Sequence, residues 1–135
     1  MWKGWIIEES LEDKNFLLKL KVLKSVVERN TEGDQVEVWH LDTVEVDDAN
    51  IDGIAQELEK QLKRRYYTHF TDFNNLLIIF KGKSFKIRLM ERPKDEAHGA
   101  VKFRTYPEDL KIWKAAFDYG VKIGKVDPRY IVKVE

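Results

Sequence analysis

A histidine and an aspartate two positions apart are the first residues in the chain that could do chemistry. His40 and Asp42 lie within residues 36–46, a run rich in β-branched and aromatic side chains that is typical of a β-strand. On a strand both side chains would point to one face, roughly 6–7 Å apart along the chain. A carboxylate so placed could orient the imidazole for acid–base catalysis or metal binding. A structural pair satisfied by backbone groups explains the same residues, and we favour this interpretation because such short matches are common by chance.

Metal sites require several converging ligands, and the chain offers few. His69 and His98 are the other histidines, and no two of the three have H-x-H or H-x-x-x-H spacing. A block of carboxylates could hold Mg²⁺ or Ca²⁺, but it does not follow the EF-hand pattern. The block comprises Asp42, Glu45, Asp47, Asp48 and Asp52. Capping of the following helix explains Asp47 and Asp48, so we predict no metal and no cofactor.

A basic stretch with interleaved aromatic residues is the second place where binding could occur. Lysine and arginine heads could neutralise phosphates while exposed rings stack on bases, as on sheet surfaces that hold single-stranded nucleic acid. The residues that would do this are Arg64, Arg65, Tyr67, Lys81, Lys83, Phe85, Lys86 and Arg88. In the alternative interpretation, which we rank higher, the rings belong to the core and the charges form a solvated face.

The aromatic side chains are a third candidate surface. Trp2, Trp5, Trp39 and Trp113, if exposed together, would mark a protein interface or a ligand groove. We expect most of these rings in the core, because burying them is the largest stabilisation available to a domain of this size.

Catalytic signatures are missing from the sequence. It contains no P-loop, no G-x-G-x-x-G, no G-x-S-x-G and no H-E-x-x-H motif. It also contains no cysteine, which excludes disulfides, thiolate metal sites and cysteine nucleophiles. We therefore favour a protein that is not an enzyme.

Length and composition suit one folded domain that spans residues 1–135, with 43% hydrophobic and 36% charged residues. The formal net charge is zero, so nothing global favours nucleic acid or an anionic membrane. The charge is uneven locally: residues 42–59 carry seven acids and no Lys or Arg, whereas residues 60–88 carry eight basic residues and one acid. No signal-peptide pattern or membrane-length apolar run is present, which predicts a cytoplasmic protein without membrane contact.

The N-terminal half is predicted to form strands. We expect a strand at residues 2–9, a helical turn at 10–16 begun by a capping box of Ser10 and Asp13, and a strand to about residue 29. Residues 16–23 fit both a helical stripe and strand alternation. Turn-forming residues at 30–34 and the strand at 36–46 predict a hairpin.

The C-terminal half is predicted to contain two helices and a meander. Apolar spacing predicts helices at 48–64 and 110–121, the second begun by a capping box of Thr105 and Glu108. Strands are expected at 65–71, 76–81, 83–90 and 101–104, a loop at 91–100, and a terminal strand or an extended arm at 130–134. Residues 76–80 are apolar on both faces, which predicts a strand in the middle of a sheet.

These elements predict an α+β fold, a single mainly antiparallel β-sheet with two main α-helices packed against it. The leading functional hypothesis is a small non-enzymatic protein that binds another protein. Single-stranded nucleic acid is the second hypothesis, and a small enzyme that uses His40 and Asp42 is the third. No pattern in the chain indicates an oligomeric state.

Overall fold

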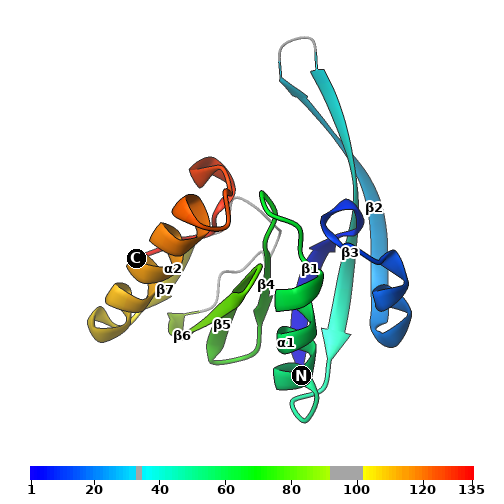
Figure 1. The fold of residues 1–135 in the computed structure, drawn as a ribbon. Helices are drawn as coiled ribbons and strands as arrows, with labels where there is room; N and C mark the ends of the chain where they lie inside the picture. The colour runs from blue at the N-terminus through cyan, green and yellow to red at the C-terminus, as the bar shows by residue number, and fades with distance from the viewer. Residues whose placement is uncertain (33–34, 92–101) are drawn as a thin grey trace.

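The computed structural model describes residues 1–32, 35–91 and 102–135. Within these ranges eight strands form one sheet, connected by two α-helices and four short 3-10 helices. In chain order the elements are β1 (Trp2–Ile7), η1 (Glu8–Ser10), η2 (Lys14–Lys19), β2 (Lys21–Glu32), β3 (Gln35–Val46), α1 (Ile51–Gln61), β4 (Thr68–Thr71), β5 (Asn75–Phe80), β6 (Lys83–Glu91), β7 (Lys102–Thr105), η3 (Pro107–Asp109), α2 (Leu110–Lys122), η4 (Pro128–Tyr130) and β8 (Lys133–Val134). Figure 1 shows their arrangement.

The sheet has the strand order β2-β3-β1-β4-β5-β6-β7-β8. Every neighbouring pair is antiparallel except β7 and β8. The predicted meander is present as β4-β5-β6, and Gly82 turns the chain between β5 and β6 with φ +89°, a conformation that favours glycine. The prediction of a mainly antiparallel sheet with two main helices is confirmed at this level.

The two helices cover opposite faces of the sheet, and the pleat of β5 shows why the strand must be apolar throughout. Leu77 and Ile79 belong to the core that contains α1, whereas Leu76, Ile78 and Phe80 belong to the core that contains α2. Successive side chains of a strand point to opposite faces, so each core receives alternate residues. The predicted burial of residues 76–80 is therefore confirmed, and the strand joins both cores.

α2 lies unusually close to the sheet because a glycine faces it. A Cβ atom built on Gly120 would lie 2.5 Å from Cε1 of Phe80, so no larger residue fits without movement. α1 buries Ile51, Ala55 and Leu58 on the opposite face. The helix is shorter than the predicted 48–64, since it begins after Asn50 and ends before Leu62.

The prediction of two capping boxes is wrong, because neither pair of residues forms the hydrogen bonds of a capping box. The hydroxyl of Ser10 donates to the carbonyl of Ile7, and Asp13 caps η2 by accepting the N–H of Asn15. The hydroxyl of Thr105 donates to the carbonyl of Arg88 across the sheet instead of capping α2.

Residues 16–23, which fit both a helical stripe and strand alternation, form a helical turn followed by a strand. η2 runs to residue 19, and β2 begins at residue 21. The predicted loop at 91–100 lies outside the described residues except for its first residue, which ends β6. None of the helices in the described ranges has both the length and the apolar character needed to cross a membrane.

Candidate binding groove

A groove of about 910 Å³ opens on the α2 face of the sheet, between the β2–β3 hairpin and the segment that follows α2. α2 packs over β5 and β6, so neither α1 nor α2 covers the adjoining surface of β3, β1 and β4 (Figure 1). The lining side chains come from β1, from β2, from β3, from residues 65–69, which include the start of β4, and from residues 121–130. Five separate stretches of the chain therefore build one concave surface.

Aromatic rings form the floor of this groove. Trp5 stacks on His69 with ring centres 4.9 Å apart, and Tyr67 lies on the other side of His69 at 6.5 Å. The half-buried ring of Trp39 meets the exposed ring of Tyr130 edge-on at 5.8 Å. Trp5 and His69 face the groove because their neighbours Ile6 and Phe70 point into the α1 core.

Tyr67 fastens the C-terminal wall of the groove to β4. Its hydroxyl accepts the N–H of Val132 at 3.0 Å and donates to the carbonyl of Tyr130. Burial of the phenol raises the pKa of Tyr67, so the hydroxyl keeps its proton over the ordinary pH range. The hydroxyl of Tyr67 therefore joins residues 130–132 to the start of β4, a contact that we call the clamp.

Two non-glycine residues in the left-handed region flank the groove. Arg65 has φ 79° and Lys125 has φ 57°, and within the described residues they alone combine a side chain with positive φ. Their segments are joined, since the N–H of Arg65 donates to the carbonyl of Gly124 at 2.7 Å. Lys125 lies two residues after Ile123, the C-cap of α2, and the N–H of the next residue, Val126, donates back to the carbonyl of Gly120 at 2.9 Å. Strained residues of this kind gather at functional sites, although a helix cap explains Lys125 structurally.

Charges of both signs surround the aromatic floor. Arg129 lies 2.7 Å from Asp127, and the hydrogen bonds from its guanidinium lower the pKa of that carboxyl. On the opposite side the hydroxyl of Tyr66 lies 3.4 Å from a carboxylate oxygen of Glu37. Partial burial, followed by this carboxylate, raises the pKa of Tyr66. The lining also includes Glu28, so the rim carries three carboxylates beside its cations.

The indole nitrogen of Trp39 is a buried donor without an acceptor among the residues that the structure describes. A buried N–H that makes no hydrogen bond costs about 1–3 kcal/mol. The corresponding nitrogen of Trp113 donates to the carbonyl of Val132 at 3.1 Å. Trp39 therefore carries an unused hydrogen-bond donor in the wall of the groove.

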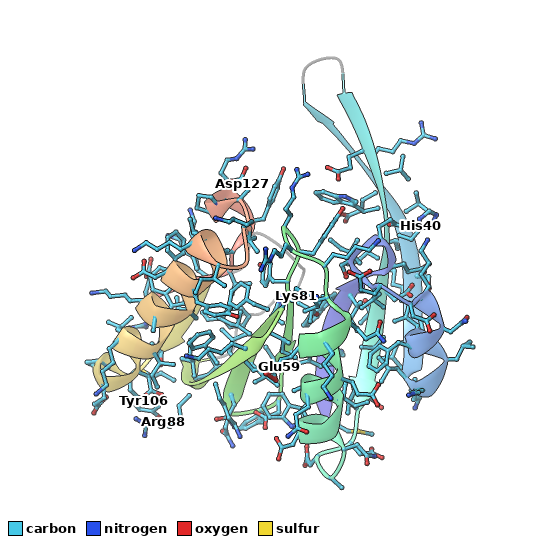
Figure 2. All side chains as sticks on the ribbon, viewed as in Figure 1. His40, Glu59, Lys81, Arg88, Tyr106 and Asp127 are labelled. Carbon is cyan, nitrogen blue, oxygen red and sulfur yellow. The ribbon has the colours of Figure 1, made fainter. Side chains whose placement is uncertain are left out.

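His40 and Asp42 share a strand, but each has its own partners. The ring Nδ1 of His40 lies 2.9 Å from Glu9, an exposed contact at the far right of Figure 2. Asp42 is buried and accepts the hydroxyl of Ser25 at 2.6 Å. Burial, together with a hydrogen bond to Asp42, raises the pKa of Glu8. The candidate pair that the third hypothesis uses thus lies outside the groove lining.

The eight residues predicted to bind nucleic acid are divided among several places. Arg65 and the half-buried Tyr67 line the groove, and Arg64 is exposed beside them in sequence. The Nζ of Lys81 lies 3.3 Å from the carbonyl of Leu62.

The remaining four of these residues alternate along β6. Lys83 lies over the ring of Phe85 on the α2 side, whereas Lys86 lies over Trp2, which belongs to the α1 core. Arg88 makes a two-pronged contact with Asp109, far from His40 in Figure 2. The pleat of β6 therefore separates the residues that were predicted to share one face, and nucleic-acid binding stays a prediction.

Sequence reasoning missed most of the groove, although it named the aromatic content as a possible ligand surface. Trp5, Trp39, Tyr66 and Tyr130 come together only in the folded sheet. In the part of the chain that the structure describes, no three His, Asp or Glu side chains are placed to hold a metal ion. Comparison of the chain with protein-family models, curated proteins and solved structures found no match.

Proposed function

We propose that this is a non-enzymatic binding protein that holds a segment of another protein in the aromatic groove. The observation that carries the proposal is the gathering of Trp39, Tyr66 and Tyr130 around one concave surface of about 910 Å³. Ligand pockets commonly measure about 300–1,000 Å³, and tryptophan, tyrosine and arginine dominate the binding energy of protein interfaces. The groove has both the size and the residue types of a peptide-binding surface.

The rim charges favour a polypeptide over a polyphosphate. The rim has four basic residues, Arg29, Arg65, Lys125 and Arg129, and three carboxylates, Glu28, Glu37 and Asp127. Nucleic-acid sites present mainly lysine and arginine, because each phosphate is held by a cation that replaces its counterions. Three carboxylates at the rim would repel such a backbone, whereas a peptide can offer side chains of either sign to match them.

The unused donor of Trp39 also suits a peptide. An extended peptide exposes backbone carbonyls that are not hydrogen-bonded within the peptide itself. One such carbonyl could accept the indole N–H if binding of the peptide moves the side chains that bury it. Binding would then relieve an unsatisfied donor.

The proposal can be tested with a random peptide library displayed on phage and selected against the immobilised protein. Enriched peptides are synthesised with a fluorophore, and their affinity is measured by anisotropy. We expect Trp39→Ala and Tyr130→Ala to weaken binding about thirtyfold, the effect of truncating an interface hot spot. Tyr130→Ala keeps the backbone carbonyl that Tyr67 binds, so it should leave the clamp intact.

Phe73→Ala is the matched control, because this aromatic ring is 77% exposed in the turn between β4 and β5. It should leave peptide affinity unchanged. Failure to enrich any peptide, or equal binding by Trp39→Ala and the parent protein, would contradict the proposal. Tight binding of an oligouridine that falls linearly in log affinity with log salt, and is lost in Trp39→Ala, would replace the peptide with single-stranded nucleic acid.

A further inference from the structure

The sheet ends on one side in a long strand with an open edge. Among the strands that the structure describes, β2 has twelve residues and pairs with β3 alone, whereas the strand at the other edge, β8, has two residues. Figure 1 shows β2 on the outer side of the molecule, with the upper part of the hairpin projecting clear of both helices. An edge strand presents unpaired N–H and C=O groups that can pair with another strand.

Exposed apolar side chains follow this edge. Val22, Leu23 and Val27 of β2 are 41%, 44% and 59% exposed, and Val38 on the neighbouring strand is 40% exposed. Four of the large exposed hydrophobic residues thus lie on one hairpin. Such a concentration along an open edge is typical of a surface that is covered by another chain.

We infer that the occupant is a second copy of this chain, paired antiparallel through β2 around a two-fold axis at Val26. In that register Lys24 of each copy lies opposite Glu28 of the other, and Val26 lies opposite itself. Lys24, Val26 and Glu28 share one face, because their partners on β3 are Thr43, Leu41 and Trp39 in alternate positions. Two opposite-charge pairs therefore flank a central contact between valines.

Neighbouring registers lack this match. A two-fold axis permits only registers in which facing residues point to the same side of the sheet. If the two-fold axis passed through Ser25, Lys24 would lie opposite Val26 of the other copy. If it passed through Val27, Glu28 would lie opposite Val26 of the other copy. The charges of the strand are thus self-complementary in one register of the three.

The arrangement has a consequence for the groove. The two-fold axis stands perpendicular to the sheet, so both copies would present the same face to the same side. The two aromatic grooves would then open side by side on one continuous sheet, with eight strands from each copy. The contact is a single strand edge, so the dimer should be weak and dependent on concentration.

Charge reversal tests the register by sedimentation equilibrium, in which the monomer has a mass of 16.0 kDa. Lys24→Glu or Glu28→Lys alone should raise the dissociation constant of the dimer about tenfold or more, because each places like charges opposite one another twice. The double variant should restore the affinity of the parent protein. Lys114→Glu, an exposed lysine on α2, should have no effect.

Introducing a single cysteine provides an independent test, since the chain contains no cysteine of its own. Val26→Cys would face its own copy across the axis, where facing Cα atoms lie about 4.5–5.5 Å apart, within disulfide range. Mild oxidation should cross-link Val26→Cys and leave Lys114→Cys a monomer. A parent protein that stays monomeric up to millimolar concentration, a dimer indifferent to Lys24→Glu, or equal cross-linking of both cysteine variants would overturn the inference.

Discussion

Replacing Tyr67 with phenylalanine removes one hydroxyl that holds the C-terminal wall of the groove. The hydroxyl accepts the N–H of Val132, which is fully buried, and donates to the carbonyl of Tyr130. Without it, the N–H of the buried residue Val132 loses the acceptor that the structure gives it. A buried unsatisfied donor costs about 1–3 kcal/mol and an ordinary hydrogen bond contributes about 1 kcal/mol, so Tyr67→Phe should lower the free energy of unfolding by about 2–3 kcal/mol.

Two other tyrosines provide a graded comparison. The hydroxyl of Tyr119 donates to the carbonyl of Lys81 at 2.7 Å, so Tyr119→Phe should cost about 1 kcal/mol. Tyr106 is partly exposed, and Arg88 lies over its ring, a contact that phenylalanine keeps. Tyr106→Phe should change stability by less than about 0.5 kcal/mol. Urea unfolding followed by tryptophan fluorescence gives all three values.

The raised pKa of Tyr67 adds a dependence on pH to the same experiment. In the unfolded chain the phenol ionises near pH 10, whereas in the folded protein it stays protonated to higher pH. The folded state therefore binds more protons above pH 10, and stability falls as the pH rises. The stability advantage of the parent protein over Tyr67→Phe should shrink above pH 10. If Tyr67→Phe is as stable as Tyr106→Phe at neutral pH, the clamp has no energetic role and the reasoning is refuted.

Four further substitutions test the packing, the backbone and the charges. Gly120→Ala should cost about 1–3 kcal/mol in urea unfolding because its Cβ would meet the ring of Phe80, whereas Gly53→Ala, with nothing within 4 Å, should gain about 0.5–1 kcal/mol. Lys125→Gly should raise the free energy of unfolding by up to about 1 kcal/mol by relieving a left-handed backbone, yet weaken peptide binding in the groove. Asp109→Asn should reduce the loss of stability that the protein shows on acidification below pH 3.8. Hydrogen bonds from a guanidinium lower the pKa of Asp109. The stabilising effect of this carboxylate disappears as it is protonated, and the asparagine has no such effect to lose. Stability measured between pH 2 and 5 with and without this substitution decides the last point.

Much of the sheet could be predicted because its signals are local. The apolar run at 76–80 has no polar face, so a central strand is the natural place for it. Gly82 between two strands predicts the tight turn that the structure contains. Residues 10–20 were harder, because short 3-10 helices have no apolar period long enough to distinguish them from a turn or a strand.

The groove could not be predicted, since its parts are distant in sequence and their meeting depends on sheet order. β1 lies between β3 and β4, which brings Trp5 against His69 and places both rings on the same surface as Trp39. Arg65 and Lys125 are neither glycine nor asparagine, so their left-handed backbone has no signal in the sequence. The alternation of Lys83 and Lys86 on β6 could have been predicted, because residues three apart on a strand point to opposite faces.

The most direct test of the groove is the amide and indole region of a ¹H–¹⁵N NMR spectrum during titration with a peptide enriched in the phage selection. The four tryptophans give four indole signals. Trp39 and Trp5 line the groove, whereas Trp2 lies in the core on the α1 side. We predict that the indole signals of Trp39 and Trp5 shift with peptide concentration while that of Trp2 stays in place. A shift confined to Trp2, or none at any tryptophan, would contradict the assignment of the groove as the binding surface.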